Sequence, residues 1–446
     1  NAEARALVES LQASDDPNAA DALRARFEAL AIDERTLLDD AGVAADLAGD
    51  EHASLQAVPD AEQTPERAMR AAQLEALLAH LHRARERMGQ ARSQLRRRQA
   101  ARAHRRGAAA LERLKRAREQ LQDPARILDG LVVDGTALLT ETRSLADAGV
   151  AVGPDGAGAT ALPDWLDAAY LHDVQASVAE RTAELDDRLR GALDQAASVT
   201  DPERRALLDA VAGAAPHLGR ARARFAEALD ALALEDVGAG AERQAEGLDA
   251  LVRAREELLD LRGLIEVSYA DQRRIQAVLS ADEAAVEERG PLDEYAPALQ
   301  SLQTRNLERA GRIATLLEQA RSRLEGQEAA DDEGAEATRA ERERLDLADG
   351  LLALTESAMR GARIPLADLA TDPAAAEAAR ERVANAVRGL EALRRLFFTL
   401  VEHVRDTARR QVELGDETEA AGGLPEAERA DALAPLTERQ SGLGRT

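Results

Sequence analysis

The stretch "LEALLAHLHRARERMGQARSQL", Leu74 to Leu95, decides the fold class because its apolar residues recur in steps of three and four. This spacing lines them up along one side of an α-helix, as in the seam of a coiled coil. The seam positions are Leu74, Leu77, Leu81, Ala84, Met88, Ala91 and Leu95. The stretch therefore predicts a long helix that packs against a neighbour along its length.

The composition of the 446-residue chain extends this prediction to the whole molecule. Apolar residues make up 45% of it and aromatic residues only 2%, so the core must consist of Leu, Val and Ala. Ala, Leu, Arg and Glu are good helix formers, whereas strand-favouring residues are scarce. We predict an elongated all-α protein of long antiparallel helical hairpins and coiled-coil segments, without a β-sheet.

Helix starts are indicated by a capping residue followed by proline. Five such pairs occur, at Asp16-Pro17, Thr64-Pro65, Asp123-Pro124, Asp201-Pro202 and Asp372-Pro373. Their uneven spacing argues against a fixed-period solenoid.

These signals and the loop-like segments divide the chain into eight predicted parts. They are short helices in 1–62, a long helix or hairpin with a following helix in 63–148, a Gly-rich linker at 149–162, a helical pair or triple in 163–237, an antiparallel coiled-coil hairpin in 240–325, an acidic linker at 326–336, C-terminal helices in 337–414 and a polar tail at 415–446.

A second seam runs without a break from Leu251 to Leu279 and predicts one continuous helix. A helical run after Gly290-Pro291 should pack antiparallel to it, which brings Gln272 level with Gln303 and Asn306. We predict a buried polar layer there that fixes helix register; the alternative is a site for a polar ligand or ion.

The last long helix is expected from Pro373 to Leu414, with a wide apolar arc that includes Phe397, Phe398 and Val401. So wide an arc needs several helices or another subunit to cover it. A core role is the preferred interpretation and an interface the alternative.

Charge is distributed unevenly. The chain has 58 basic and 83 acidic residues, a net charge of −25, yet residues 83–118 contain fourteen basic and two acidic residues. That segment carries +12 and the remainder −37. Its centre is "RRRQAARAHRR", Arg96 to Arg106.

Extending the first seam through this stretch assigns Arg98, Arg102 and Arg105 to seam positions, where a dry core does not accept unpaired charges. The segment must therefore end a helical hairpin or bend into solvent. Apolar positions are expected to resume at Leu111, Leu114 and Leu121.

The basic segment has four interpretations. It docks onto acidic helices of this chain or of a second copy, or it binds an acidic protein partner, an anionic lipid surface or nucleic acid. Nucleic acid ranks last because no aromatic residue is interleaved to stack bases. The candidate binding residues are Arg96, Arg97, Arg98, Arg102, Arg105 and Arg106.

No catalytic, cofactor-binding or metal-binding motif is found. The chain has no cysteine, and no histidine follows a glutamate by three residues, which excludes the Glu-x-x-His signature of di-iron bundles. The segment "GPDGAGAT" lacks the lysine of a phosphate-binding loop. Trp165, Tyr170, His172 and Asp173 cluster in sequence, and a packed helix start is the preferred interpretation.

We therefore expect a non-enzymatic scaffold or assembly component of a bacterial complex that binds other proteins, including copies of itself, and associates with an anionic membrane surface. The alternatives are a polyanion-binding accessory protein and a helical bundle that binds a small molecule or metal. Asn1 in place of an initial methionine fits removal of a secretory signal, so the expected location is periplasmic or otherwise extracytoplasmic, with the cytoplasm as the alternative.

Overall fold

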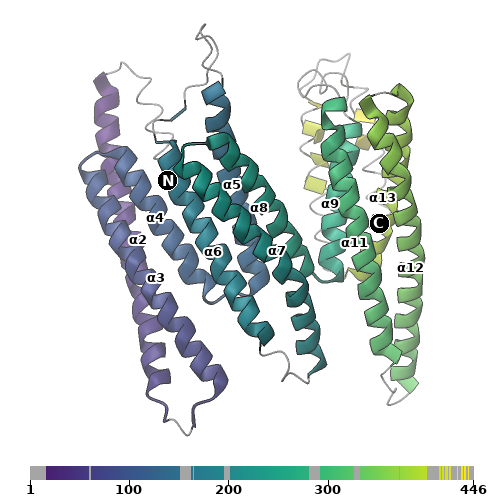
Figure 1. The fold of residues 1–446 in the computed structure, drawn as a ribbon, viewed down its shortest axis with the longest axis horizontal. Helices are drawn as coiled ribbons and strands as arrows, with labels where there is room; N and C mark the ends of the chain where they lie inside the picture. Colours follow the sequence, from purple (N-terminus) through teal and green to yellow (C-terminus); the bar gives the residue numbers. More distant parts are fainter. Residues whose placement is uncertain are drawn as a thin grey trace. The chain divides into compact units, whose positions relative to one another are not determined.

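The computed structural model describes residues 17–59, 62–150, 162–163, 165–194, 201–280, 292–325, 332–370, 372–398 and scattered positions between 411 and 440. These residues form helices and no strand, which confirms the all-α class (Figure 1). The helices are α2 (Pro17–Gln56), α3 (Pro65–Arg96), α4 (Ala100–Glu119), α5 (Pro124–Val150), α6 (Ala168–Asp194), α7 (Pro202–Ala233), α8 (Val237–Glu257), α9 (Leu261–Leu279), α11 (Leu292–Glu325), α12 (Asp332–Ala367), the short 3₁₀ helix η3 (Asp368–Ala370) and α13 (Pro373–Phe397).

All five proline signals mark helix starts, because α2, α3, α5, α7 and α13 each begin at the proline of one pair. At Thr64, Asp123 and Asp372 the side chain of the preceding residue caps the helix. The Thr64 hydroxyl accepts a hydrogen bond from the Arg67 backbone N–H at 3.3 Å, and the Asp372 carboxylate accepts one from Ala374 at 2.9 Å. Such caps satisfy N–H groups that have no partner inside the helix.

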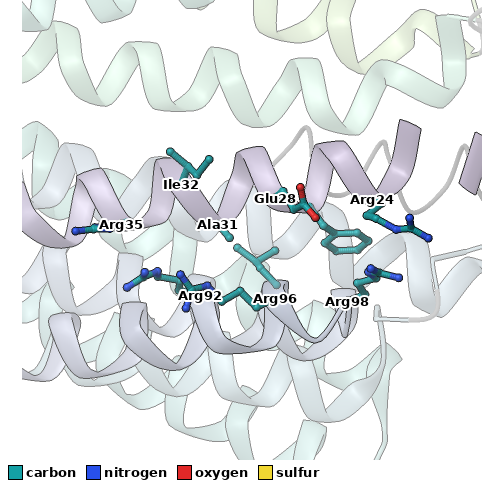
Figure 2. A pocket seen from close by; sticks show the side chains of 10 residues that line it. Arg24, Glu28, Ala31, Ile32, Arg35, Arg92, Arg96 and Arg98 are labelled. Carbon is teal, nitrogen blue, oxygen red and sulfur yellow. The ribbon is translucent and has the colours of Figure 1, made fainter. Parts of the chain in front are cut away.

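The chain divides into two compact units between Leu258 and Leu259. In the first unit α3 packs against both α2 (Figure 2) and α4, while α5 packs against α6 and α8, and α7 against α6 and α8. In the second unit α11 packs against α9 and α12, and α13 packs against the same two helices.

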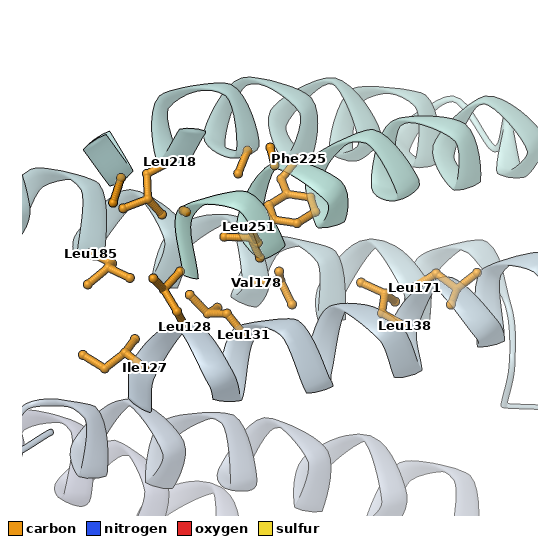
Figure 3. Packing of buried hydrophobic residues seen from close by; sticks show 14 of the residues in the cluster. Ile127, Leu128, Leu131, Leu138, Leu171, Val178, Leu185, Leu218, Phe225 and Leu251 are labelled. Carbon is orange, nitrogen blue, oxygen red and sulfur yellow. The ribbon is translucent and has the colours of Figure 1, made fainter. Parts of the chain in front are cut away.

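Each unit has its own core of aliphatic side chains. In the first unit, α5 to α8 direct Leu128, Val178, Phe225 and Leu251 toward one another (Figure 3), and none of these is more than 1% exposed. In the described part of the second unit, the largest hydrophobic core cluster includes Leu264. Burying a Leu or Phe side chain contributes roughly 1.5–3 kcal/mol, so such cores suffice without aromatic-rich packing.

Two helices differ in length from the sequence-based prediction. In place of several short helices, the described part of 1–62 contains the single 40-residue helix α2. Its two glycines cost about 1 kcal/mol each in a helix. Burial of Phe27, Ala45 and Ala48 against α3 and α4 offsets that cost. At the other end, α13 stops at Phe397 rather than continuing to Leu414, because the Phe398 backbone is extended, with φ −87° and ψ 142°.

The continuous helix predicted from Leu251 to Leu279 is wrong. It is broken into α8 and α9, and the Asp260 carboxylate caps α9 by accepting a hydrogen bond from the Gly263 N–H at 2.8 Å. The predicted face is nevertheless buried on both sides of the break. Leu251 belongs to the core of the first unit and Ile265 to a core of the second.

The two predicted linkers fall mainly outside the described residues. α5 continues to Val150, and residues 151–161 of the predicted Gly-rich linker are not described. α12 begins at Asp332, inside the predicted acidic linker 326–336, whose first six residues are also not described.

Candidate functional site at the α3–α4 turn

The basic stretch forms the turn of the α3–α4 hairpin, one of the two predicted alternatives. The backbone N–H groups of Arg98 and Gln99 donate to the carbonyls of Leu95 and Gln94 at 2.9 and 3.0 Å. This hydrogen-bond pattern closes a helix through one residue in the left-handed conformation. That residue is Arg98, with φ 56°.

The α3 seam is buried as the spacing predicts. None of its seven residues is more than 7% exposed: Leu74, Leu77, Leu81, Ala84, Met88, Ala91 and Leu95. Beyond the turn, Arg98, Arg102 and Arg105 are exposed. The hairpin therefore ends where continuation of the seam would have buried arginine.

The buried face of α4 differs from the expected one. Leu111 and Leu121 are 45% and 48% exposed, so the prediction that they resume the apolar face is wrong, whereas Leu114 is half-buried. The buried apolar residues are Ala103, Ala110 and Ala117. Small side chains allow α4 to lie close to α3.

Three basic residues of the segment, all from Arg105 onward, pair with carboxylates of this chain. The Arg105 guanidinium lies 2.5 Å from the Asp167 carboxylate, and Lys115 lies 2.8 Å from Asp134. Arg116 pairs with two glutamates of α6, Glu180 at 2.7 Å and Glu184. For these residues the interpretation of docking onto the chain's own acidic helices is supported.

These pairs border a buried charge network centred on Arg181 of α6, whose side chain is fully buried. Its Nε donates to Glu119 at 2.9 Å, and its Nη1 donates to Asp134 at 2.6 Å. Burial disfavours the charged guanidinium, but these hydrogen bonds outweigh burial and raise the pKa of Arg181. Burial also raises the pKa of Glu119, although Arg181 opposes that shift.

Other arginines of the segment are different. Arg96, Arg97, Arg98 and Arg106 are exposed, and none forms an ion pair with any residue that the structure describes. Arg102 is also exposed and donates to the Gln99 side chain at 3.3 Å. We call these five residues the hairpin end. Arg105, the sixth residue predicted to bind a partner, instead pairs with Asp167.

His104 of the basic segment packs into an aromatic cluster that the sequence analysis missed. Its ring centroid lies 5.0 Å from that of Trp165 and 5.9 Å from that of Tyr170. His172, which lies close to Trp165 and Tyr170 in sequence, is 37% exposed and lies beside the exposed Asp173. The cluster joins α4 to the start of α6, and no sequence signal connects residues so far apart.

The predicted polar layer lies in the core of the second unit, with Gln272, Gln303 and Asn306 fully buried. Gln272 Nε2 donates to Gln303 Oε1 at 2.8 Å, and Gln303 Nε2 donates to the Met359 carbonyl at 2.9 Å. Asn306 Oδ1 accepts from Arg309 at 2.8 Å. The layer thus connects α9, α11 and α12 through specific hydrogen bonds, which is how a buried polar group fixes register.

The aromatic pair at the end of α13 divides between core and surface. Phe397 is 5% exposed and belongs to a core cluster of the second unit. Phe398 is half-buried, with the Arg394 guanidinium 5.0 Å from its ring centroid. Val401 lies outside the described residues.

Among the described residues, no group of three or more His, Cys, Asp or Glu side chains is arranged to hold a metal ion. No helix in the same part of the chain is long and apolar enough to cross a membrane. The chain matches no protein-family model, no curated protein and no solved structure. The hairpin end is therefore the candidate functional site.

Proposed function

We propose that this chain is a non-enzymatic helical scaffold that binds an acidic segment of a partner protein through the hairpin end. The observation that carries the proposal is a set of exposed arginines that form no ion pair with any described residue, in a chain that has 83 acidic residues. Guanidinium groups bind carboxylates through paired, charge-assisted hydrogen bonds. The hairpin supports several of them on a short, hydrogen-bonded turn.

An acidic protein segment is preferred to nucleic acid for two reasons. The stretch from Arg96 to Arg106 contains no Phe, Tyr or Trp for stacking on bases. The net charge of −25 also repels a long polyanion, whereas a short acidic segment contacts only the local positive charge. An anionic lipid surface is the competing partner.

The proposal is tested by in-cell cross-linking followed by capture of the full chain. We expect a reproducible partner whose cross-linked region is rich in Asp and Glu. That partner should be lost in a triple variant that leaves the turn intact, Arg97→Gln, Arg102→Gln and Arg106→Gln. A control variant makes the same charge change at exposed arginines of the second unit, Arg273→Gln, Arg382→Gln and Arg388→Gln, and should retain the partner.

Purified protein then separates the competing partners. Poly-glutamate, phosphatidylglycerol vesicles and duplex DNA are compared at one ionic strength, because all three interactions weaken with added salt. Poly-glutamate binding that the triple variant abolishes supports the proposal. Binding confined to vesicles or DNA, or equal loss of the partner in both triple variants, contradicts it.

A further inference from the structure

A pocket of about 360 Å³ lies between α2 and the C-terminal end of α3, next to the hairpin end. Figure 2 shows Arg24 and Arg98 at one end of it and Arg35 and Arg92 at the other. Ligand sites for small molecules have volumes of roughly 300–1,000 Å³, so this pocket is within that range.

The floor of the pocket is apolar. Phe27 and Ala31 of α2 and Leu95 of α3 are each 6–7% exposed, and they belong to one small core cluster. A ligand that covers them would remove the remaining apolar surface from water, a favourable process.

The rim is strongly cationic. Five arginines and one glutamate line the pocket, which gives it a net formal charge of +4: Arg24, Arg35, Arg92, Arg96, Arg98 and Glu28. Within the described part of the chain, Arg92, Arg96 and Arg98 have no ion pair. Arg24 and Arg35 each form an ion pair with a carboxylate one helical turn away on α2, Asp21 at 3.4 Å and Asp39 at 3.8 Å.

Arg98 supplies an independent observation. It occupies the position at a helix end where the left-handed conformation favours glycine. Residues other than glycine in this conformation occur both at ordinary helix ends and at ligand sites. Here the conformation brings its guanidinium to the pocket rim.

We propose that this pocket binds a small amphiphilic anion, a carboxylate or phosphate on a short apolar body. The guanidinium groups hold the anionic group by paired hydrogen bonds, and Phe27, Ala31 and Leu95 contact the apolar body. This site goes beyond the proposed function and does not depend on it, although Arg96 and Arg98 belong to both.

The probe is octyl phosphate, titrated into the full chain by calorimetry. Binding should be saturable with one site, while inorganic phosphate and octanol, which each lack one half of the chemistry, bind at least about tenfold more weakly. Octanoate should bind as well. Vesicles of phosphatidic acid in phosphatidylcholine test whether the same chemistry is recognised on a lipid headgroup.

Two variants with equal charge change localise the site. Arg24→Gln with Arg92→Gln removes one guanidinium from each end and should weaken octyl phosphate binding at least about tenfold. Arg97→Gln with Arg106→Gln alters exposed arginines that do not line the pocket and should change the affinity less than about twofold. Because the second pair belongs only to the hairpin end, failure of this site and failure of partner binding are distinguishable.

Chemical modification provides a measurement without variants. Octyl phosphate should protect Arg92, Arg96 and Arg98 from phenylglyoxal while Arg97 and Arg106 still react, as read by peptide mass spectrometry. Equal binding of octyl phosphate and octanol, equal loss in both double variants, or absence of selective protection would overturn the proposal. Vesicle binding that is lost in the pocket variant supports it and identifies the lipid as the source.

Discussion

Arg98 adopts a backbone conformation that glycine adopts at lower cost. A left-handed conformation costs a residue with a Cβ roughly 1–2 kcal/mol, and glycine avoids this steric cost. Glycine also loses more conformational entropy on folding, so only part of that free energy appears as added stability. We expect Arg98→Gly to raise the free energy of unfolding by about 0.5–1 kcal/mol in urea titration, and to weaken octyl phosphate binding.

Glu235 provides the matched control for that substitution. It has φ 61° at the end of α7 and the same hydrogen-bond pattern, with its N–H donating to the Leu232 carbonyl at 3.0 Å. Glu235→Gly should stabilise the protein by a similar amount and leave anion binding unchanged. If Arg98→Gly lowers stability while Glu235→Gly raises it, the side chain of Arg98 contributes to the fold rather than to a site.

His80 should make the stability of the first unit depend on pH. Burial lowers the pKa of this half-buried imidazole, and the nearby Arg116 lowers it further. The neutral form is therefore favoured in the folded state. Its contribution is fully present above the unfolded pKa of about 6.5 and is lost as the pH falls through the lower folded value.

We expect His80→Gln to reduce the loss of unfolding free energy between about pH 7.5 and 5, measured by urea titration at several pH values. His82 is exposed on the same helix and supplies the control substitution, His82→Gln. Identical pH profiles for the parent and the His80 variant would contradict this assignment.

At the scale of elements, α7 and α8 depend on a close approach at Gly247. A Cβ at this position would lie 2.5 Å from the Phe225 ring, in the core shown in Figure 3. We expect Gly247→Ala to lower the free energy of unfolding by about 1–3 kcal/mol, because the ring must move in a packed core.

Gly191 of α6 is the matched control, since a Cβ there would meet no atom within 4 Å. Gly191→Ala should raise the free energy of unfolding by about 0.5–1 kcal/mol through helix propensity alone. Equal effects at the two positions, read by thermal unfolding, would show that the α7–α8 contact adapts without cost.

Much of the element structure was predictable from local signals. Proline pairs gave five helix starts, and the spacing from Leu74 to Leu95 gave the buried face of α3. The α8–α9 break was not predictable from spacing, because Leu251 and Ile265 keep one register while they pack into different cores. Periodicity specifies which face is buried and does not specify its partner.

The site was only half predictable for a related reason. The arginines at the turn followed from the charge distribution, but the buried face of α4 consists of Ala103, Ala110 and Ala117, which carry little weight in a pattern of large apolar residues. The α2 side of the anion pocket, including Arg24 and Phe27, comes from a helix distant in sequence. Only tertiary packing brings it to α3.

At the scale of the whole molecule, two units with separate cores should unfold in separate transitions. Leu128 and Leu390 are each at most 1% exposed, one in each unit. Replacement of either by alanine should cost about 2–5 kcal/mol. By calorimetry, Leu128→Ala should lower the midpoint of one transition and Leu390→Ala that of the other.

A single transition that both substitutions lower equally would show that the units unfold together.

Isolated surface ion pairs contribute little to the stability of the protein, because exposed pairs such as Arg105 with Asp167 are worth about 0.2–1 kcal/mol. The buried network around Arg181 is different, since removal of one partner of a buried pair costs about 3–5 kcal/mol.

Trp165 is the only tryptophan of the chain, and it is packed between His104 of α4 and Tyr170 of α6. Indole emission shifts in wavelength when its surroundings become wet, so this residue is an intrinsic optical probe of the contact between the hairpin and α6. Movement of the hairpin away from α6 changes the emission. Fluorescence alone therefore follows the arginine-bearing hairpin in the unlabelled protein.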